Sequence, residues 1–123
     1  IDYALQRKQF GKPIAGHQLI QGMLAEMVTE LEAARYLVYR ALWLLSGGTR
    51  CEREAAVAKS FATEAAQRIT SKAIQIHGAF GITREFPVER HFRNARLLTI
   101  PDGTTQLNQL IIGRKLTGIA AFS

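Results

Sequence analysis

Two segments of the sequence combine ligand-binding side chains with glycine-containing turns. In the first, residues 7–14, the guanidinium of Arg7 could hold a phosphate through two parallel hydrogen bonds, and Gln18 follows soon afterwards. In the second, the Gln75 amide precedes Gly78 in a turn whose small residues permit close approach of a ligand to the backbone. Both segments also have an ordinary structural interpretation, because cations and glycines are common where helices end.

Two further segments place charged side chains in the C-terminal half. Residues 89–96 contain one acid and three arginines, a composition that usually forms ion pairs on a solvated helix face. Residues 100–106 carry Asp102 in a turn just ahead of a helical pattern. The ordinary role of a carboxylate there is to accept the free N–H groups at the start of the helix.

Long helices are predicted to position these segments. From Ile20 onward, apolar residues alternate steps of four and three, which is the pattern of one buried helical face. A helix from His17 to Leu45 would be roughly 40 Å long, and the Gly47-Gly48 pair supplies its end. A second run over 55–76 repeats the pattern with small residues, so we expect two long helices packed antiparallel.

Shorter helices complete the expected fold. The chain opens without Met and with apolar residues at helical spacing, so we expect it to begin inside a helix of a longer protein. Pro87 suits the first turn of a short helix, and Asp102 and Thr104 are capping residue types ahead of a final one. Strand signals are almost absent. The prediction is one all-α domain over residues 1–123, an up-and-down four-helix bundle with a short extra helix.

Composition and charge limit the classes of ligand and the kind of compartment that suit this protein. The 123 residues are 47% hydrophobic and carry a formal net charge of +6, which is compatible with nucleic acid, an anionic membrane or phosphate-bearing ligands. The cations are scattered around the helices without an interleaved aromatic stripe, which argues against nucleic acid. No apolar run reaches the roughly 18 residues that span a bilayer. The single cysteine, Cys51, excludes a disulfide framework and fits a reducing compartment.

Taken together, the four segments resemble the C-terminal helical domain of the acyl-CoA dehydrogenases. That family has an Arg-x-x-Phe-Gly turn with a Gln soon after and a Gln-x-x-Gly-Gly-x-Gly turn. A Pro-(Val/Met)-x-(Arg/Lys)-x-x-Arg-(Asp/Asn)-Ala stretch follows, and then Glu-Gly-Thr before the last helix. The resemblance runs from about Tyr3 to Leu116. It implies one domain of a larger flavoenzyme, truncated at its first helix and separated from the N-terminal helical and middle β domains.

The resemblance implies that this domain contacts FAD, first of all the FAD of a neighbouring subunit. Arg7, Gln9 and Phe10 match positions that contact the neighbour's flavin, with Arg7 facing its pyrophosphate. Gln18 and Gln75 match further flavin-contacting positions. These residues are therefore expected cofactor contacts.

A glycine turn and the last helix supply the remaining matches. Gly78 and Gly81 correspond to the turn that passes the adenosine side of the same flavin, in which Ala79 replaces the second glycine of the family. Thr104 and Gln106 correspond to positions near the FAD of their own subunit. The resemblance thus divides the contacts between two flavins.

Asp102 matches the position at which many family members carry a Glu. That Glu removes the α-proton of an acyl-CoA thioester while a hydride leaves the β-carbon for flavin N5. We favour Asp102 as this base, although its side chain is one methylene shorter and a shift of about 1 Å can cost about a hundredfold in rate. Other roles stay open: Asp102 caps the helix while an upstream carboxylate acts, or the chemistry is altered.

For the whole enzyme, the resemblance implies oxidation of an acyl-CoA to the 2,3-enoyl-CoA. It also implies an electron-transfer flavoprotein or similar acceptor, a homotetramer or homodimer that shares FAD across subunits, and a location in the bacterial cytoplasm or mitochondrial matrix. We expect no metal, nucleic acid or membrane to be bound and the isolated domain to be inactive. Competing interpretations are an enzyme resembling acyl-CoA oxidase or nitroalkane oxidase, one acting on a carrier-bound acyl group, and a non-enzymatic basic helical binding module.

Overall fold

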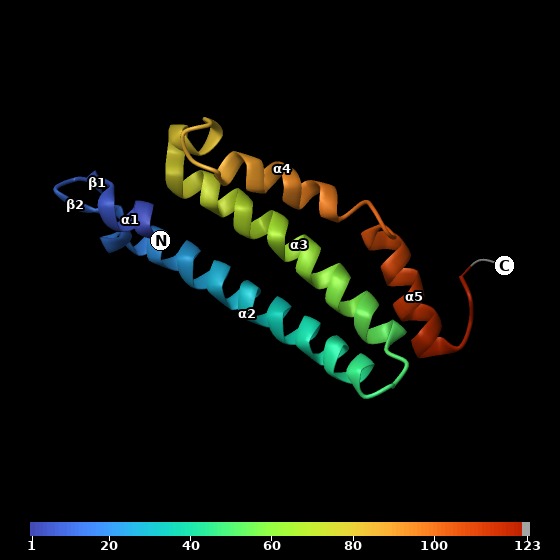
Figure 1. Ribbon diagram of the computed structural model, residues 1–123. Helices are drawn as coiled ribbons and strands as arrows, with labels where there is room; N and C mark the ends of the chain where they lie inside the picture. Colours follow the sequence, from blue (N-terminus) through green and yellow to red (C-terminus); the bar gives the residue numbers. More distant parts are fainter. Residues whose placement is uncertain (122–123) are drawn as a thin grey trace.

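The computed structural model describes residues 1–121, which form an elongated bundle of helices (Figure 1). Two long helices, α2 (Gln18–Ser46) and α3 (Glu52–His77), lie side by side and run antiparallel. The shorter helices α4 (Val88–Leu98) and α5 (Thr105–Thr117) both pack against α3. The predicted all-α helical bundle is confirmed, and α3 is the helix on which the others assemble.

Alanines line the buried faces of the two long helices. Ala34 and Ala41 of α2 are buried, as are Ala58 and Ala65 of α3. Alanine loses no side-chain entropy in a helix, and its small side chain lets neighbouring helices approach closely. All four belong to the periodic positions that predict the two helices.

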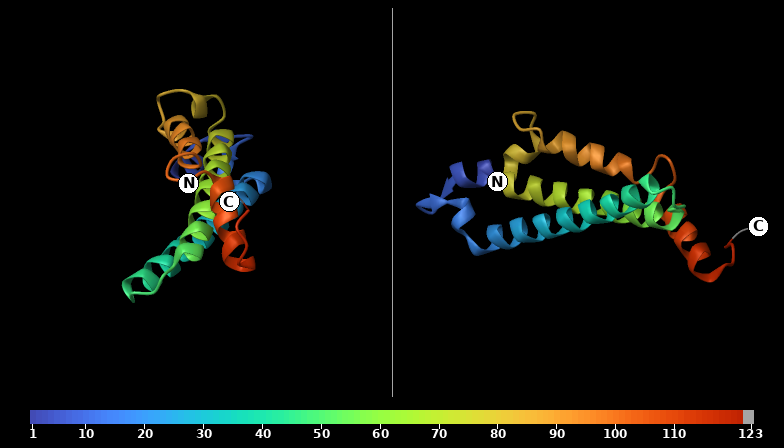
Figure 2. Two further views of the ribbon diagram at one scale, coloured as in Figure 1. Left: turned by 90° about the vertical axis from the view of Figure 1, so that its right-hand side faces the viewer. Right: turned by 60° about the horizontal axis from the view of Figure 1, so that its bottom comes forward.

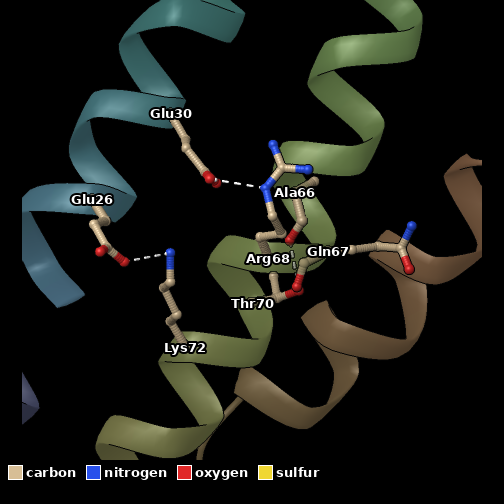
Figure 3. A network of polar contacts seen from close by, with 7 residues as sticks. All are labelled: Glu26, Glu30, Ala66, Gln67, Arg68, Thr70 and Lys72. Carbon is tan, nitrogen blue, oxygen red and sulfur yellow. Dashed lines mark hydrogen bonds and ion pairs between the residues drawn. The ribbon is translucent and has the colours of Figure 1, made fainter.

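Two neighbouring ion pairs between α2 and α3 lie near the middle of the bundle (Figure 3). Glu26 Oε2 lies 2.7 Å from Lys72 Nζ, and Glu30 Oε1 lies 2.8 Å from Arg68 Nε. Residues four apart on α2 thus meet residues four apart on α3 in reverse order, as antiparallel helices require. Because partly exposed pairs contribute at most about 1 kcal/mol each, they specify the register of the helices more than they stabilise the fold.

The N-terminal segment folds against the ends of the long helices. Helix α1 (Asp2–Gln6) buries Ala4 in a small core cluster with Ile14 and Ile76. Apolar side chains from the start of α2, among them Ile20, pack on this cluster. The first and last turns of the long helices are therefore joined by one apolar contact region.

A small antiparallel hairpin follows α1. Its strands are β1 (Lys8–Gln9) and β2 (Lys12–Pro13), and the 3₁₀ helix η1 (Ile14–Gly16) comes next. Phe10 and Gly11 form the two-residue turn with φ angles of 51° and 79°, as hairpins of this length favour. The sequence pattern does not predict this hairpin, because strands of two residues are too short to show alternation.

The remaining turns use the residues that the sequence indicates. The 3₁₀ helix η2 (Gly78–Ile82) ends α3, and Pro87 directly precedes the first residue of α4. Thr104 caps α5 by accepting a hydrogen bond from the Leu107 N–H at 3.2 Å, and Gly118, with φ of 73°, ends that helix. Within residues 1–121, no helix has the long apolar stretch that crossing a membrane requires.

Candidate functional site

The residues that the sequence assigns to the site lie at two opposite ends of α3 (Figures 1 and 2). The segment with Arg7 lies beside the C-terminal end of α3, where the Tyr3 hydroxyl donates to the His77 carbonyl oxygen at 3.2 Å. The turn that carries Asp102 lies toward the other end, where Lys59 donates to its main chain. At 1.5 Å per residue, α3 rises roughly 27 Å from Lys59 to His77.

We call the first group the hairpin end, and all of its assigned members are exposed. Phe10 stands at the tip of the hairpin with 92% of its surface exposed, and its ring lies edge-on to His17 at a centroid distance of 6.1 Å. The Arg7 guanidinium has no ion pair within residues 1–121. An exposed ring and a free guanidinium suit a partner or ligand outside this domain. The assigned members are Arg7, Gln9, Phe10, Gln18, Gln75 and Gly78.

Aromatic rings connect α1 to the end of α3. The Tyr3 ring stacks on His77 with centroids 4.2 Å apart, and Phe86 packs edge-on against Tyr3 at 5.2 Å. Phe80 in turn packs against Phe86 at 5.9 Å. These contacts hold the hairpin next to the glycine turn. The sequence does not predict this supporting cluster, because Tyr3 lies 74 residues before His77 and the rings fit no motif.

Gly78 and Gly81, both within η2, are required for different reasons. Gly78 has φ of 59° and ψ of −135°, a conformation that residues with a Cβ rarely adopt, but a Cβ there would meet open space. Gly81 is buried, and a Cβ there would lie 2.5 Å from the Ile74 carbonyl oxygen. Ala79, which replaces a family glycine, is exposed between them. The backbone of the turn is therefore accessible at Gly78, whereas at Gly81 it packs directly against the backbone of α3.

We call the second group the Asp102 turn, the connection over residues 99–105 between α4 and α5. Lys59 reaches it from α3, and its ammonium donates to the carbonyl oxygens of Pro101 and Asp102, the latter at 2.8 Å. The sequence contains no signal for this role of Lys59, because the residue lies within a regular helical pattern and more than 40 residues before the turn.

Two residues of α5 complete this support. The buried amide of Asn108 donates to the carbonyl oxygens of Gly103 and Thr104, at 3.0 and 2.9 Å. The buried Thr105 hydroxyl donates to Glu64 of α3 at 2.7 Å. Lys59 and Asn108 thus each donate to two carbonyl oxygens, and together they bind those of the four consecutive residues from Pro101 to Thr104.

The carboxylate of Asp102 is left free by this arrangement. Asp102 is exposed, and its side chain has no hydrogen bond or ion pair within residues 1–121. The cap of α5 is Thr104, so Asp102 does not fill the capping role that the sequence left open for it. Its φ of 54° is uncommon for a residue with a Cβ. Gln106 is exposed on the first turn of α5.

A groove of about 460 Å³ runs beside Asp102 between the start of α3 and α5. Ala56 and Ile111 contribute apolar surface, and Lys59 and Asp102 are polar residues of its lining. Within the described part of the chain, no cluster of His, Cys, Asp or Glu side chains is arranged to hold a metal ion.

An ion pair links the two helices that line this groove. Lys115 Nζ of α5 lies 2.5 Å from Glu52 Oε2 at the start of α3. The hydrogen bond from Lys115, and secondarily its charge, lower the pKa of the Glu52 carboxyl from its ordinary value of 4.5. The link between α3 and α5 at this point therefore depends on an ionised Glu52.

Curated proteins of known activity resemble this chain closely. An acyl-CoA dehydrogenase of Bacillus subtilis is 47% identical over 118 residues, which cover 96% of this chain and 31% of that protein. The caffeyl-CoA reductase–Etf complex subunit CarC of Acetobacterium woodii is 47% identical over 116 residues, which cover 94% of this chain and 31% of CarC. The chain thus spans about a third of the length of the relatives that it matches.

Solved structures and a family profile agree with these relatives. A structure described as the FAD complex of PigA has a TM-score of 0.90 and 34% identity, and the match covers 94% of this chain and 30% of PigA. The profile of the acyl-CoA dehydrogenase C-terminal domain matches residues 1–117, nearly the whole length. With the helical bundle and its turns in the order of that domain, the chain belongs to the acyl-CoA dehydrogenase family and corresponds to its C-terminal domain.

Proposed function

We propose that this chain is the C-terminal domain, over residues 1–123, of an FAD-dependent enzyme that oxidises an acyl-CoA thioester to the 2,3-enoyl-CoA, with Asp102 as the catalytic base. The observation that carries this proposal is the free, exposed carboxylate of Asp102 on a turn whose main chain is held by side chains of α3 and α5. A carboxylate that is fixed in place and has no partner in its own domain is suited to accept a proton.

The residues of the hairpin end fit one part of a flavin dinucleotide. Arg7 offers a guanidinium for the pyrophosphate, Phe10 an exposed ring, and Gly78 an open backbone surface. Near Asp102, Thr104 and Gln106 lie at the N-terminus of α5, where free N–H groups and the helix dipole favour polar or anionic groups. These features support FAD as the cofactor.

The proposed reaction divides the removal of two hydrogens between the protein and the cofactor. FAD, when bound, supplies the acceptor for the hydride that leaves the β-carbon. Asp102 accepts the α-proton, so that the electron pair of the α-carbon–hydrogen bond forms the new double bond. The exposed position of its carboxylate lets a substrate approach from outside this domain. The remaining two thirds of the enzyme, with N-terminal helical and middle β domains, would hold most of the substrate.

The separation of the two groups supports the sharing of FAD between subunits. The hairpin end and the Asp102 turn lie at opposite ends of α3, which supports contact with two different flavins (Figure 2). Helix α2 also exposes a row of aromatic residues, Tyr36, Tyr39 and Trp43, whose exposed fractions are 68%, 57% and 74%. Apolar surface of this kind supports contact with other domains or subunits. We therefore propose a homo-oligomer, either a tetramer or a dimer.

The electron acceptor and the compartment are part of the same proposal. A relative that is 47% identical is a subunit of a complex that includes Etf, which supports an electron-transfer flavoprotein or similar acceptor. The enzyme would act in the bacterial cytoplasm or the mitochondrial matrix.

Anaerobic reduction of the flavin by acyl-CoA in the full-length enzyme tests the proposed base. We expect Asp102→Asn to retain FAD and to lose flavin reduction, because an amide cannot accept the α-proton. Near-normal reduction would move the base to a carboxylate elsewhere. Asp102→Glu serves as the matched control, since it keeps the carboxylate and restores the side-chain length common in the family.

A further inference from the structure

The main chain of the Asp102 turn depends on side chains to fix its position. Within this turn, the backbone N–H of Thr105 donates to the Thr99 carbonyl oxygen at 3.2 Å, and Ile100 N–H donates back to α4. The carbonyl oxygens of the four residues from Pro101 to Thr104 accept hydrogen bonds from Lys59 and Asn108. The geometry of the turn is thus set by these two side chains.

Asn108 and Lys59 hold the turn from different parts of the chain. Asn108 lies four and five residues after the carbonyls that it binds, so it shapes the turn locally. Lys59 lies on α3, 42 and 43 residues before Pro101 and Asp102. Its ammonium therefore contacts the main chain of Asp102 directly from the central helix, whereas the bond from Thr105 to Glu64 holds the end of the turn.

The anchored residue also has an uncommon main-chain conformation. A φ of 54° is disfavoured for a residue with a Cβ, because the side chain crowds the following carbonyl. Without the hydrogen bonds from Lys59, no side chain of α3 would hold the carbonyl oxygens of Pro101 and Asp102. The anchor is a hydrogen bond to the same residue's main chain, at 2.8 Å.

The ammonium of Lys59 bonds to main-chain carbonyls and forms no ion pair with the Asp102 carboxylate within the described residues. A direct ion pair would occupy the carboxylate oxygens and stabilise their charged form. Binding through the carbonyl oxygens fixes the residue and leaves its carboxylate oxygens available to a substrate. The hydrogen bonds from Lys59 thus fix the backbone at Asp102 and leave the Asp102 carboxylate free.

We infer that Lys59 is a positioning residue for the reaction, which holds the Asp102 carboxylate where it can reach the α-proton; this inference rests on the proposed role of Asp102. A misplacement of about 1 Å can lower a catalytic rate by about a hundredfold. Loss of the Lys59 donors therefore slows proton removal without removing the carboxylate.

Single-turnover reduction of the flavin by saturating acyl-CoA in the full-length enzyme is the test. We expect Lys59→Met, which keeps the length of the side chain but has no donors, to slow reduction by about 10- to 100-fold. FAD content and KM should change little, and the isotope effect from α-deuterated substrate should rise. Lys59→Arg should restore most of the rate, because its guanidinium can still donate to both carbonyls.

A matched control uses the same substitution on the same helix. Lys72→Met removes an α3 ammonium that binds Glu26 on α2, far from the Asp102 turn, and it should leave the rate unchanged. A loss of FAD in Lys59→Met, or an equal slowing in Lys72→Met, would mean that Lys59 supports the fold in general, and the inference would be overturned.

The Asp102→Asn variant separates this inference from the proposed function. If Asp102→Asn blocks reduction and Lys59→Met reduces flavin at the wild-type rate, Asp102 is the base and Lys59 does not position it. If Asp102→Asn reduces flavin normally, the base lies elsewhere and both proposals fall. If both single variants are slow, the double variant should be no slower than Asp102→Asn alone, whereas a further loss would contradict action through Asp102.

Discussion

The Tyr3 ring stacks on the His77 ring with centroids 4.2 Å apart, and the Tyr3 hydroxyl donates to the His77 carbonyl oxygen at 3.2 Å. Through this double contact, the first helix is attached to the last turn of α3. Because the hairpin follows α1 directly and η2 follows His77, the contact also sets the distance between Arg7 and Gly78. The parts of the hairpin end are therefore held together by residues that we do not assign to ligand binding.

Tyr3→Phe should loosen the hairpin end while keeping the stacked ring. The variant loses one hydrogen bond, whose net contribution is about 1 kcal/mol. We expect faster hydrogen exchange in residues 8–16 and 78–82 of the full-length enzyme, measured by mass spectrometry. Thr117→Val, which removes the side-chain hydrogen bonds of Thr117 at the end of α5, should leave exchange in both segments unchanged. Unchanged exchange in Tyr3→Phe would show that the stacked rings suffice.

Substitution of Gly78 and Gly81 by alanine should separate the effect of a steric clash from the effect of unfavourable backbone angles. Gly81→Ala forces a Cβ to 2.5 Å from the Ile74 carbonyl oxygen, so we expect a loss of stability of about 3 kcal/mol. Gly78→Ala meets no neighbour, so only its backbone angles oppose the substitution, at a cost of about 1–3 kcal/mol. Thermal unfolding of the full-length variants measures both, and a Gly78→Ala variant less stable than Gly81→Ala would contradict this assignment.

The register of the long helices should respond to charge reversal. Glu30→Arg places two cations together on α2 and α3, and we expect a loss of about 1 kcal/mol because the pair is partly exposed. Adding Arg68→Glu recreates the pair with reversed signs and should recover most of the loss. Chemical denaturation of both variants and the parent checks this coupling, which is disproved if the double variant is no more stable than Glu30→Arg.

Acid should weaken the link between α3 and α5. Because Lys115 lowers the pKa of Glu52 in the folded protein below 4.5, ionised Glu52 stabilises the fold above pH 4.5. This contribution is lost as pH falls through the lowered pKa and Glu52 takes up a proton. We expect Glu52→Gln to be less stable than the parent at neutral pH and equal to it in strong acid. Unfolding midpoints measured across this range give the comparison, and a difference that persists unchanged in acid would contradict it.

The sequence predicts the helices well because their signal is local. Apolar residues at steps of three and four mark α2 and α3 almost to their ends, and the Gly47-Gly48 pair and Pro87 mark the turns. The hairpin at Phe10 gives no such signal, since its two-residue strands have no periodicity.

The support of the site is harder to predict because its contacts are long-range. Lys59 is one polar residue in a regular helix, and nothing in its neighbourhood indicates a contact 43 residues away. Asp102 and Thr104 are both capping residue types, and only the observed geometry assigns the cap to Thr104. The division of the site between two ends of α3 likewise depends on how the chain folds back. From the sequence, the family resemblance indicates only that the contacts are divided between two flavins.

The most direct test of the proposed base is the exchange of the α-hydrogens of a saturated acyl-CoA in anaerobic D₂O, followed by mass spectrometry with full-length enzyme whose flavin is already reduced. Because hydride transfer cannot proceed, exchange reports proton removal alone. We predict incorporation of deuterium at the α-carbon with the parent enzyme and none above background with Asp102→Asn. Equal incorporation by both enzymes would show that another group removes the proton and would contradict the role assigned to Asp102.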